Sequence, residues 1–173
     1  MADDQKPPLV VVVTGVSGSG KTTVGELLAE RLGWEYAEAD DFHPPANITK
    51  MRAGTPLTDA DRRPWLHAIG AWIDGRLAAG APGVVTCSAL KRSYRDLLTG
   101  GRERVLLVYL DGDKELIARR ISARSGHFFK PEMLDSQFRD LEPPAPDEPV
   151  VRVPIDAPAE EIVRRIAALA RTE

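Results

Sequence analysis

The sequence has few of the features that mark disulfide-rich, membrane or nucleic-acid-binding proteins. Its single cysteine, Cys87, excludes an intramolecular disulfide framework and a cysteine-based metal cage. The apolar run at residues 9–13 is too short for a signal peptide or a membrane span. A formal net charge of -3 leaves no strongly basic footprint for nucleic acid. These absences favour a cytoplasmic protein that acts on a small molecule, with no nucleic acid and no membrane as partner.

The remaining composition fits one compact domain. The chain has 173 residues, of which 43% are hydrophobic, enough to build a substantial core. The first residues combine early acids with prolines. We therefore expect residues 1–8 to form a flexible tail and residues 9–173 to form a single domain.

Short apolar runs alternate with helical patterns along the chain. The β-branched run at 9–13 predicts a strand buried on both faces, and a glycine loop and a helical pattern ending at Gly33 follow it. Further strands are expected at 34–37, 84–86, 105–110 and 150–153, with helices at 65–77, 116–121 and 162–169. This order predicts a three-layer α/β fold, a parallel sheet flanked by helices.

Two stretches interrupt the alternation. Residues 40–64 are rich in Asp, Pro, Thr and Arg, and residues 124–149 hold a Gly-His-Phe-Phe segment followed by a proline-rich run. Insertions on a rigid sheet commonly carry substrate contacts or a closing lid. A solvated connection is the alternative, especially for residues 143–149.

One motif points directly to nucleotide chemistry. It matches the pattern G-x-x-x-x-G-K-[ST] between a predicted strand and a predicted helix, and it consists of Gly15, Val16, Ser17, Gly18, Ser19, Gly20, Lys21 and Thr22. Its backbone N–H groups and the helix N-terminus favour phosphate. Lys21 is expected to reach the β- and γ-phosphates of ATP, and the Thr22 hydroxyl to bind Mg²⁺.

Acidic residues follow two of the predicted strands. Glu38, Asp40 and Asp41 stand at the end of the second strand, where a carboxylate can accept the proton of an attacking hydroxyl. We favour Asp40 for that role; capping or solvent exposure is the alternative, and is favoured for Asp41. Asp111 resembles the magnesium-binding acid of a Walker B strand, but Gly112, Asp113 and a helix follow it, which favours capping.

Longer motifs identify a family. They are Asp40-Asp41-Phe42-His43-Pro44 with Asn47, residues 56–66 (Pro-Leu-Thr-Asp-Ala-Asp-Arg-Arg-Pro-Trp-Leu), residues 87–95 (Cys-Ser-Ala-Leu-Lys-Arg-Ser-Tyr-Arg), Gly126-His127-Phe128-Phe129 and residues 137–142. Together they resemble the gluconokinases of the shikimate kinase-like group, over about residues 10–166. The resemblance implies a P-loop kinase fold with a five-stranded parallel sheet, a substrate-binding region at about 40–64 and a lid at about 124–135. It also implies a homodimer that phosphorylates D-gluconate at its terminal hydroxyl with ATP and Mg²⁺.

The resemblance also assigns roles to single residues. It places Asp40 on the acceptor hydroxyl, Glu38 near the water shell of the magnesium, and Arg62 on the substrate carboxylate. Arg120 lies against the adenine and Arg124 closes onto the phosphates. The guanidinium of Arg62 suits a carboxylate, although a surface ion pair with Asp59 or Asp61 is the alternative.

Polar residues near these sites are further candidates. Lys91 and Arg95 are four residues apart at an expected helix start, which places them on one face. That face either binds substrate, which we favour for Lys91, or is solvated. Ser88 and His43 are candidates for the polyol chain, with an unliganded loop histidine as the alternative for His43. His127, Phe128 and Phe129 either seal the lid or anchor it.

Two other functions fit the phosphate loop. A shikimate or nucleoside monophosphate kinase would share the sheet, the loop and the lid. A GTPase-like switch would normally carry the guanine-reading motif Asn-Lys-x-Asp, which the sequence does not contain. The segments around Asp40 and Arg62 favour the gluconokinase alternative over both.

Overall fold

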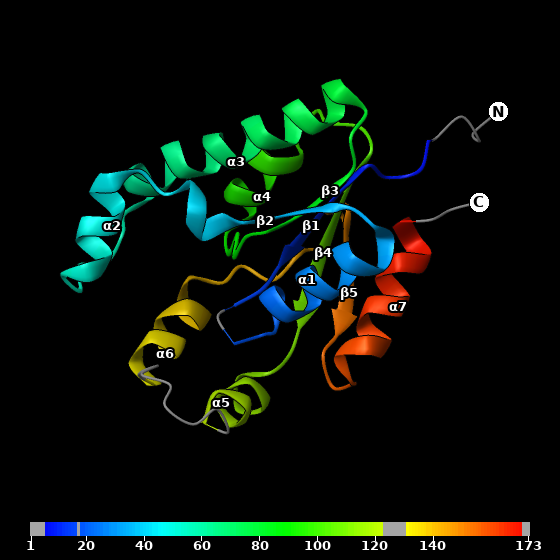
Figure 1. Cartoon of the computed structure of the whole chain (residues 1–173). Coiled ribbons are helices and arrows are strands. Elements are labelled where there is room, and N and C mark those ends of the chain that lie inside the picture. Colours follow the sequence, from blue (N-terminus) through cyan, green and yellow to red (C-terminus); the bar gives the residue numbers. More distant parts are fainter. Residues whose placement is uncertain (1–5, 17, 123–130, 171–173) are drawn as a thin grey trace.

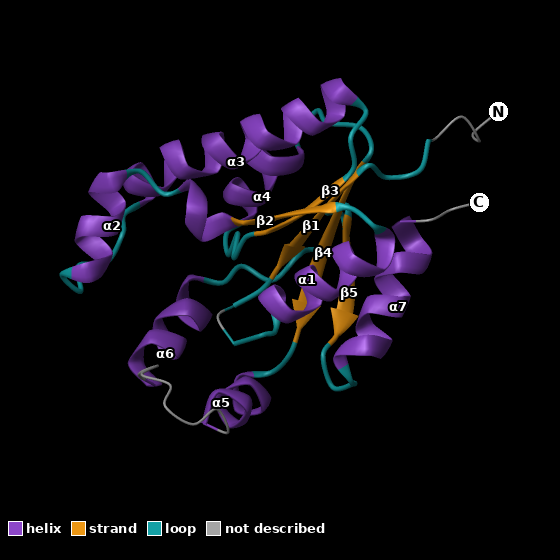
Figure 2. Cartoon of the chain, in the orientation of Figure 1, coloured by secondary structure: helices purple, strands orange, loops and turns teal. Residues whose placement is uncertain are grey.

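The computed structural model of the chain, which describes residues 6–16, 18–122 and 131–170, is a parallel sheet between two layers of helices (Figures 1 and 2). The strands lie in the order β2-β3-β1-β4-β5, and each pairs in parallel with its neighbours. They are β1 (Val10–Thr14), β2 (Glu35–Glu38), β3 (Gly83–Thr86), β4 (Val105–Asp111) and β5 (Val150–Pro154). The predicted three-layer fold with a five-stranded sheet is confirmed.

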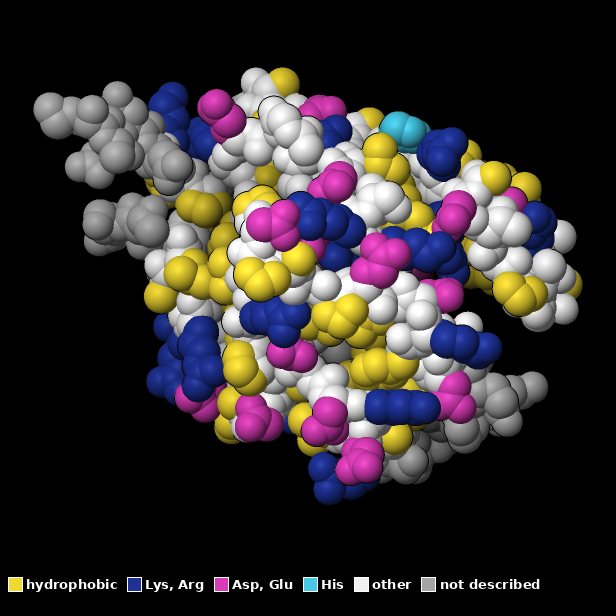
Figure 3. All heavy atoms as spheres, turned by 180° about the vertical axis from the view of Figure 1, so that it is seen from behind, with side chains coloured by type: hydrophobic (Ala, Val, Ile, Leu, Met, Phe, Trp, Pro, Cys, Tyr) yellow, Lys and Arg dark blue, Asp and Glu magenta, His cyan; other side chains and the backbone are white. Residues whose placement is uncertain are grey.

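Helices cover both faces of the sheet. They are α1 (Lys21–Leu32), α2 (Pro45–Arg52), α3 (Asp59–Ala79), α4 (Arg92–Thr99), α5 (Lys114–Ser122), α6 (Pro131–Asp140) and α7 (Ala159–Ala170), with a 3-10 turn η2 at Ala39–Phe42. Helices α1 and α7 pack together over one face, and α3 and α4 lie over the other. Seen from behind, the surface shows basic and acidic side chains intermixed (Figure 3).

Strand β1 is central because both of its faces are covered. Val11 and Val13 belong to the core under α1 and α7, whereas Val10 and Val12 belong to the core under α3 and α4. All four valines are fully buried, which explains the continuous apolar run in the sequence. Strands β2 and β3 lie on one side of β1, and β4 and β5 lie on the other, so the order in which successive strands join the sheet reverses at β1. In open α/β sheets the ligand crevice lies at such a point, at the carboxyl ends of the strands.

The first predicted insertion, at residues 40–64, is more ordered than its composition indicates. It contains most of η2, all of α2 and the first turn and a half of α3. Helix α3 starts at Asp59, before the predicted start at residue 65, because Thr58 and Asp61 form a capping box. Thr58 Oγ1 accepts from the Asp61 amide over 3.1 Å, and the Asp61 carboxylate accepts from the Thr58 amide over 2.9 Å.

The second predicted insertion contains a helix that the sequence analysis missed. Helix α6 spans Pro131–Asp140 and follows residues that the structure does not describe. The predictions for Arg124, His127, Phe128 and Phe129, and the first part of the expected lid, lie outside the described residues. In the part of the chain that the structure describes, none of the helices is both long and apolar enough to cross a membrane.

Candidate active site

The phosphate loop joins β1 to α1, as its motif requires. Gly15 and Gly18 have φ angles of 152° and 80°, which L side chains rarely adopt. A Cβ at Gly15 would also lie 2.6 Å from Ser19 Oγ, closer than real Cβ contacts. The turn therefore needs glycine at both positions. Ser17, another predicted loop residue, lies outside the described residues.

The loop leads into the N-terminus of α1. Gly20 is the N-cap, with φ 97° and ψ 17°. A cavity of about 90 Å³ lies there, lined by Gly18, Gly20, Lys21, Thr22 and Thr23. Exposed N–H groups and the helix dipole favour an anion at such a site. The local geometry is that of a phosphate cradle.

The side chain of Lys21 folds back over this loop. Its Nζ donates a hydrogen bond to the Val16 carbonyl over 3.0 Å. Burial lowers the pKa of Lys21 to about 8, and the nearby Cys87, Asp40 and Glu38 only partly oppose that shift. Among the described residues, Asp40 and Glu38 supply negative charge near Lys21 but do not outweigh its burial. A phosphate placed beside it would favour its charged form.

Glu38, at the end of β2, is held by three hydroxyl groups. Its Oε1 accepts from Thr22 Oγ1 at 2.7 Å, from the Tyr36 hydroxyl at 2.5 Å and from Thr86 Oγ1 at 3.4 Å. Burial would raise the pKa of Glu38, but these hydrogen bonds outweigh it, so the pKa lies below its usual value. Burial and the bond to Glu38 raise the pKa of Tyr36. Glu38 is therefore an ionised carboxylate beside the phosphate loop.

Thr22 and Glu38 fit a magnesium site. A hydroxyl and a carboxylate are hard oxygen ligands, and Mg²⁺ is usually bound by one or two such groups together with nucleotide phosphates and water. Within residues 6–16, 18–122 and 131–170, no group of three or more His, Cys, Asp or Glu side chains is arranged so that it could hold a metal ion. An all-protein metal cage is therefore not what the described residues offer.

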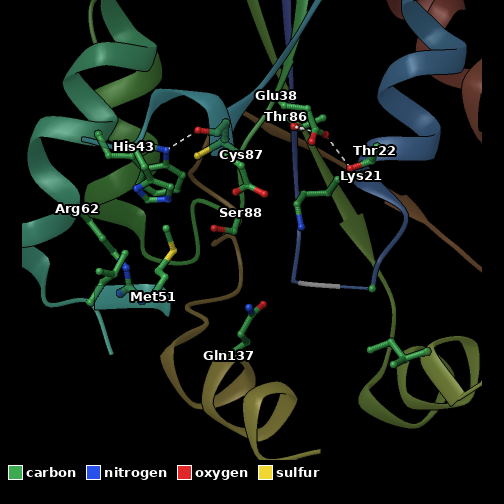
Figure 4. A pocket seen from close by; sticks show the side chains of 16 residues that line it. Lys21, Thr22, Glu38, His43, Met51, Arg62, Thr86, Cys87, Ser88 and Gln137 are labelled. Atoms are coloured by element: carbon green, nitrogen blue, oxygen red, sulfur yellow. Dashed lines mark hydrogen bonds between the residues drawn. The ribbon is translucent and has the colours of Figure 1, made fainter. Parts of the chain in front are cut away.

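A larger cleft of about 570 Å³ opens from the phosphate loop across the ends of the strands. Figure 4 shows Lys21, Thr22 and Glu38 on one side of it and His43, Met51 and Arg62 on the other, with Cys87 and Ser88 between them. It brings together these predicted site residues: Gly18, Lys21, Thr22, Glu38, Asp40, His43, Arg62 and Ser88. Nucleotide and acceptor candidates thus share one cavity.

Asp40 and Asp41 differ in their relation to the cleft. Asp40 lines it from η2, close enough to Lys21 for their charges to interact. Both side chains are exposed, but Asp41 is not part of the cleft wall. The choice of Asp40 over Asp41 as proton acceptor remains a prediction, and this geometry favours it.

His43 is fixed from two directions. Its ring stacks on Trp65, with centroids 4.4 Å apart and planes 9° apart. Asn47 Nδ2 lies 3.2 Å from His43 Nδ1 and donates to the Asp61 carbonyl over 2.8 Å. Burial, with a smaller contribution from Arg62, lowers the pKa of His43, although Asp40 opposes the shift. A neutral ring with Nδ1 as acceptor and Nε2 as donor satisfies these contacts.

Arg62 stands at the far end of the cleft and hydrogen-bonds a tyrosine hydroxyl rather than a carboxylate. Its Nη1 donates to the Tyr94 hydroxyl over 3.2 Å, and its guanidinium carbon lies 5.8 Å from the centre of the Tyr94 ring. The two acids proposed as alternatives are bound by lysines, Asp61 by Lys50 at 2.8 Å and Asp59 by Lys91 at 3.0 Å. Arg62 therefore forms no direct ion pair with either acid, although its charge contributes to the lowered pKa of Asp59.

Lys91 lies beside Arg62 and outside the cleft wall. Besides its ion pair with Asp59, its Nζ lies 5.6 Å from the centre of the Tyr94 ring. It is the N-cap of α4, with φ -101° and ψ 147°, so it precedes the helix. The expectation that Lys91 and Arg95 share a helical face is wrong, because the four-residue spacing applies only within a helix. Arg95 is buried and neither solvated nor lining the cleft.

Two further predicted residues have contacts away from the cleft. Arg120 Nη2 donates a hydrogen bond to the Ile155 carbonyl, after β5. Asp111 ends β4 and lies 3.7 Å from Arg152, while the cap of α5 comes from Asp113, whose Oδ1 accepts from the Leu116 amide over 2.8 Å. The expected capping role of Asp111 is therefore wrong. The adenine role of Arg120 remains a prediction.

The cleft also contains residues that sequence reasoning did not assign to it: Ala39, Met51, Leu57, Trp65, Thr86, Cys87, Ile121 and Gln137. Burial raises the pKa of the Cys87 thiol to about 12, so this thiol stays neutral and unreactive. Thr86 ends β3, next to β1, and Cys87 follows it. Their place at the carboxyl end of a predicted strand was the available signal. Gln137 reaches the cleft from α6 (Figure 4).

Comparison with known proteins places this site in context. A family model described as an AAA domain matches residues 10–144. The chain is 48% identical to a gluconokinase of Gluconobacter oxydans (strain 621H) over 165 residues, 93% of each chain. It superposes on a gluconokinase from Sinorhizobium meliloti 1021 with a TM-score of 0.80 at 47% identity, covering 96% of this chain and 92% of that one. An unliganded sugar kinase from Janibacter sp. HTCC2649 gives 0.84 at 47% identity, covering 94% of each.

Proposed function

The chain belongs to the gluconokinase family of P-loop kinases, and from this premise we infer that it transfers the γ-phosphoryl group of ATP to D-gluconate. The product is 6-phospho-D-gluconate, with ADP released. The observation that carries this function is the single cleft that joins a phosphate loop to a polar acceptor wall ending in Arg62. The sequence segments around Asp40 and Arg62, which contribute to that wall, resemble gluconokinases rather than shikimate or nucleoside monophosphate kinases.

The nucleotide half of the cleft holds the phosphates. We propose that the loop from Gly15 to Gly20 cradles them and that Lys21 neutralises charge that develops on the transferred group. Thr22 and Glu38 would hold Mg²⁺, Glu38 through water, and the ion would neutralise negative charge on the phosphates when bound. Arg120 at the adenine and Arg124 at the phosphates are proposed from the family resemblance.

The acceptor half would orient gluconate between a cationic side chain at one end and a carboxylate at the other. We propose that Arg62 binds the substrate carboxylate and that Asp40 addresses the terminal hydroxyl. The hydroxyl oxygen forms a bond to the γ-phosphorus as the bond to the β,γ-bridging oxygen breaks, and the hydroxyl proton passes to Asp40. His43, through Nε2–H, and Ser88 are placed to hydrogen-bond the polyol.

Lys91 has a supporting role in this scheme. It pairs with Asp59 beside Tyr94, on the same ring that Arg62 contacts. We propose that its positive charge adds to the field that attracts the substrate carboxylate. Direct contact with gluconate would require it to exchange Asp59 for the substrate.

We also propose a cellular location and an assembly state. We propose a cytoplasmic enzyme, because the one cysteine is buried and free and the substrates are metabolites. We propose a homodimer from the family resemblance, which light scattering coupled to size exclusion tests directly. A monomer mass at assay concentration would remove that proposal without affecting the kinase activity.

The function is tested by a coupled assay that follows ADP. Purified protein is supplied with magnesium-ATP and, separately, D-gluconate, shikimate, glucose or a nucleoside monophosphate, and the product is identified by mass spectrometry. We expect the highest kcat/KM with gluconate and a product phosphorylated at the terminal carbon. Equal or better kcat/KM with shikimate or a nucleoside monophosphate would overturn the assignment of gluconate as the substrate but leave the kinase activity standing.

A further inference from the structure

Arg95 is a charged side chain in the interior of the protein. Its side chain is 1% exposed, and that of its ion-pair partner Glu148 is 2% exposed. Arg95 lies on α4, and Glu148 lies in the segment between α6 and β5. Burying two charges costs free energy that a single ion pair seldom recovers. Such a pair calls for a role beyond stability.

All five N–H donors of Arg95 are used within the protein. Nε donates to Glu148 Oε1 at 2.5 Å, and Nη2 donates to Glu148 Oε2 at 3.2 Å. Nη1 donates to the carbonyls of Ala89 and Leu90, both at 3.1 Å, and Nη2 also donates to the Glu142 carbonyl at 2.8 Å. A guanidinium has five donors. Arg95 thus has none left for a substrate, which excludes it as a ligand.

Two of the three carbonyls that Arg95 binds, those of Ala89 and Leu90, belong to the turn between β3 and α4. This turn carries Ser88, which lines the cleft. Ala89, the next residue, has φ 40°, a left-handed conformation that L residues rarely adopt. Ala89 is 1% exposed and keeps this conformation while its carbonyl points to the guanidinium. Arg95 therefore holds a strained turn directly beside the acceptor site.

The same guanidinium also binds the segment that follows α6, through the Glu142 carbonyl. Glu142 lies just after α6, the helix from which Gln137 enters the cleft. Its amide donates to the Leu90 carbonyl over 2.8 Å, and its Oε1 accepts from the Arg92 amide over 3.0 Å. The end of α6 and the turn after β3 are thus fastened to each other and to Arg95.

We propose that Arg95 is a positioning residue that sets the acceptor half of the cleft, by fixing the Ser88 turn and the end of α6 as one unit. The proposal rests on the proposed function, since it assigns gluconate to that half. It makes a selective claim: loosening Arg95 should impair gluconate binding and leave nucleotide binding on the other side of the cleft intact.

Arg95→Lys tests the claim with the least disturbance. Lysine keeps a positive charge opposite Glu148 but has a single nitrogen in place of the fork, so it cannot bind the carboxylate and three carbonyls together. Misplacing a substrate-positioning group by about 1 Å commonly costs up to about a hundredfold. We expect KM for gluconate to rise at least about tenfold, with KM for ATP within about twofold of wild type.

Arg92→Lys is the matched control. Arg92 lies three residues before Arg95 on the same helix and forks onto Asp147 at 3.1 and 3.2 Å, next to Glu148 in sequence, but this pair is exposed. We expect KM for gluconate in this variant to equal that of wild type. An equal rise in both variants would make the effect a general one of this surface and overturn the proposal.

A double variant separates positioning from stability. Arg95→Gln with Glu148→Gln removes both charges together, so neither is left buried and unpaired. All variants are assayed at least 15 °C below the midpoint of their own thermal unfolding, with ATP binding measured by calorimetry. We expect the same selective rise in KM for gluconate. Equal rises for both substrates, an unchanged KM for gluconate, or failure of both variants to fold would assign the pair to stability alone and overturn the proposal.

Wild-type activity separates this proposal from the function on which it rests. If the wild-type protein does not phosphorylate gluconate, the proposed function fails first. If it does, the role of Arg95 is tested by comparing the change in KM for gluconate with the change in KM for ATP.

Discussion

Thr22 Oγ1 donates a hydrogen bond to Glu38 Oε1 over 2.7 Å, which joins the start of α1 to the end of β2. In our proposal, Thr22 and Glu38 would also hold Mg²⁺ when nucleotide is bound. We predict that Glu38→Gln raises the Mg²⁺ concentration for half-maximal activity by about tenfold, because groups that hold a metal or its ligands typically contribute that much to affinity. Magnesium titrations at saturating ATP and gluconate measure it.

Two variants frame the result. Glu38→Asp keeps the charge on a shorter side chain and should shift the magnesium midpoint less than Glu38→Gln. Glu26→Gln, at an exposed position on α1, should leave it unchanged. An unaltered magnesium midpoint in Glu38→Gln would remove Glu38 from the metal site.

The low pKa of Lys21 predicts proton uptake on nucleotide binding. Burial holds this pKa at about 8, so the lysine is mostly neutral at pH 9. Phosphates beside it favour the ammonium form and raise the pKa, and about one proton should be taken up as magnesium-ATP binds at that pH. Little uptake is expected at pH 7, where Lys21 is already protonated. Calorimetry in two buffers of different ionisation enthalpy counts the protons.

Lys21→Met is the control for that measurement. It should abolish the uptake at pH 9 and lower turnover by about a hundredfold or more, through loss of a transition-state charge contact. Proton uptake that is equal at the two pH values, or that persists in the variant, would show that another group titrates.

Asp40 and Asp41 offer a paired test of the proton acceptor. Asp40→Asn keeps the size of the side chain but removes the basic oxygen, so kcat should fall by about a hundredfold or more while ATP binding persists. Asp41→Asn, one residue away and outside the cleft wall, should change kcat little. Steady-state kinetics with both substrates, together with ATP binding by calorimetry, test this pair, and reversed effects would transfer the role to Asp41.

The strands could be predicted closely because their pattern is local. Strands buried on both faces, such as β1, leave a continuous apolar run in the sequence. Each observed strand end lies within one residue of the predicted end. Helix α6 was missed because few of its residues are apolar. Its signal was Pro131 at a helix start, followed by Leu134, Phe138 and Leu141 at helical spacing.

The site residues show the same difference between local and long-range signals. The phosphate loop was predictable because its chemistry is encoded in eight consecutive residues. Arg95 was not, because its burial depends on Glu148, which is 53 positions away, and on carbonyls of a turn whose path no local pattern describes. Lys91 was misplaced for a related reason: whether it belongs to α4 depends on where that helix starts.

The last prediction concerns how the cleft recognises its acceptor. Arg62 uses Nη1 on the Tyr94 hydroxyl, and the neighbouring acids Asp59 and Asp61 are held by lysines. We predict that Arg62→Ala lowers kcat/KM for gluconate by about ten- to a hundredfold, since loss of a charged hydrogen-bonding partner typically costs about 1.5–3 kcal/mol. The variant should lower kcat/KM for glucitol, the neutral polyol of the same chain length, much less.

The ratio of the two kcat/KM values carries the argument, because it cancels any general loss of activity. Arg63→Ala, at the exposed neighbouring position, should leave this ratio at its wild-type value. Lys91→Ala should reduce it less than Arg62→Ala does, since the Lys91 ammonium is already paired with Asp59. If Arg62→Ala lowered both values in equal proportion, the carboxylate of gluconate would be recognised elsewhere. A larger effect of Lys91→Ala would assign recognition of the carboxylate to Lys91, which would then have to release Asp59 when substrate binds.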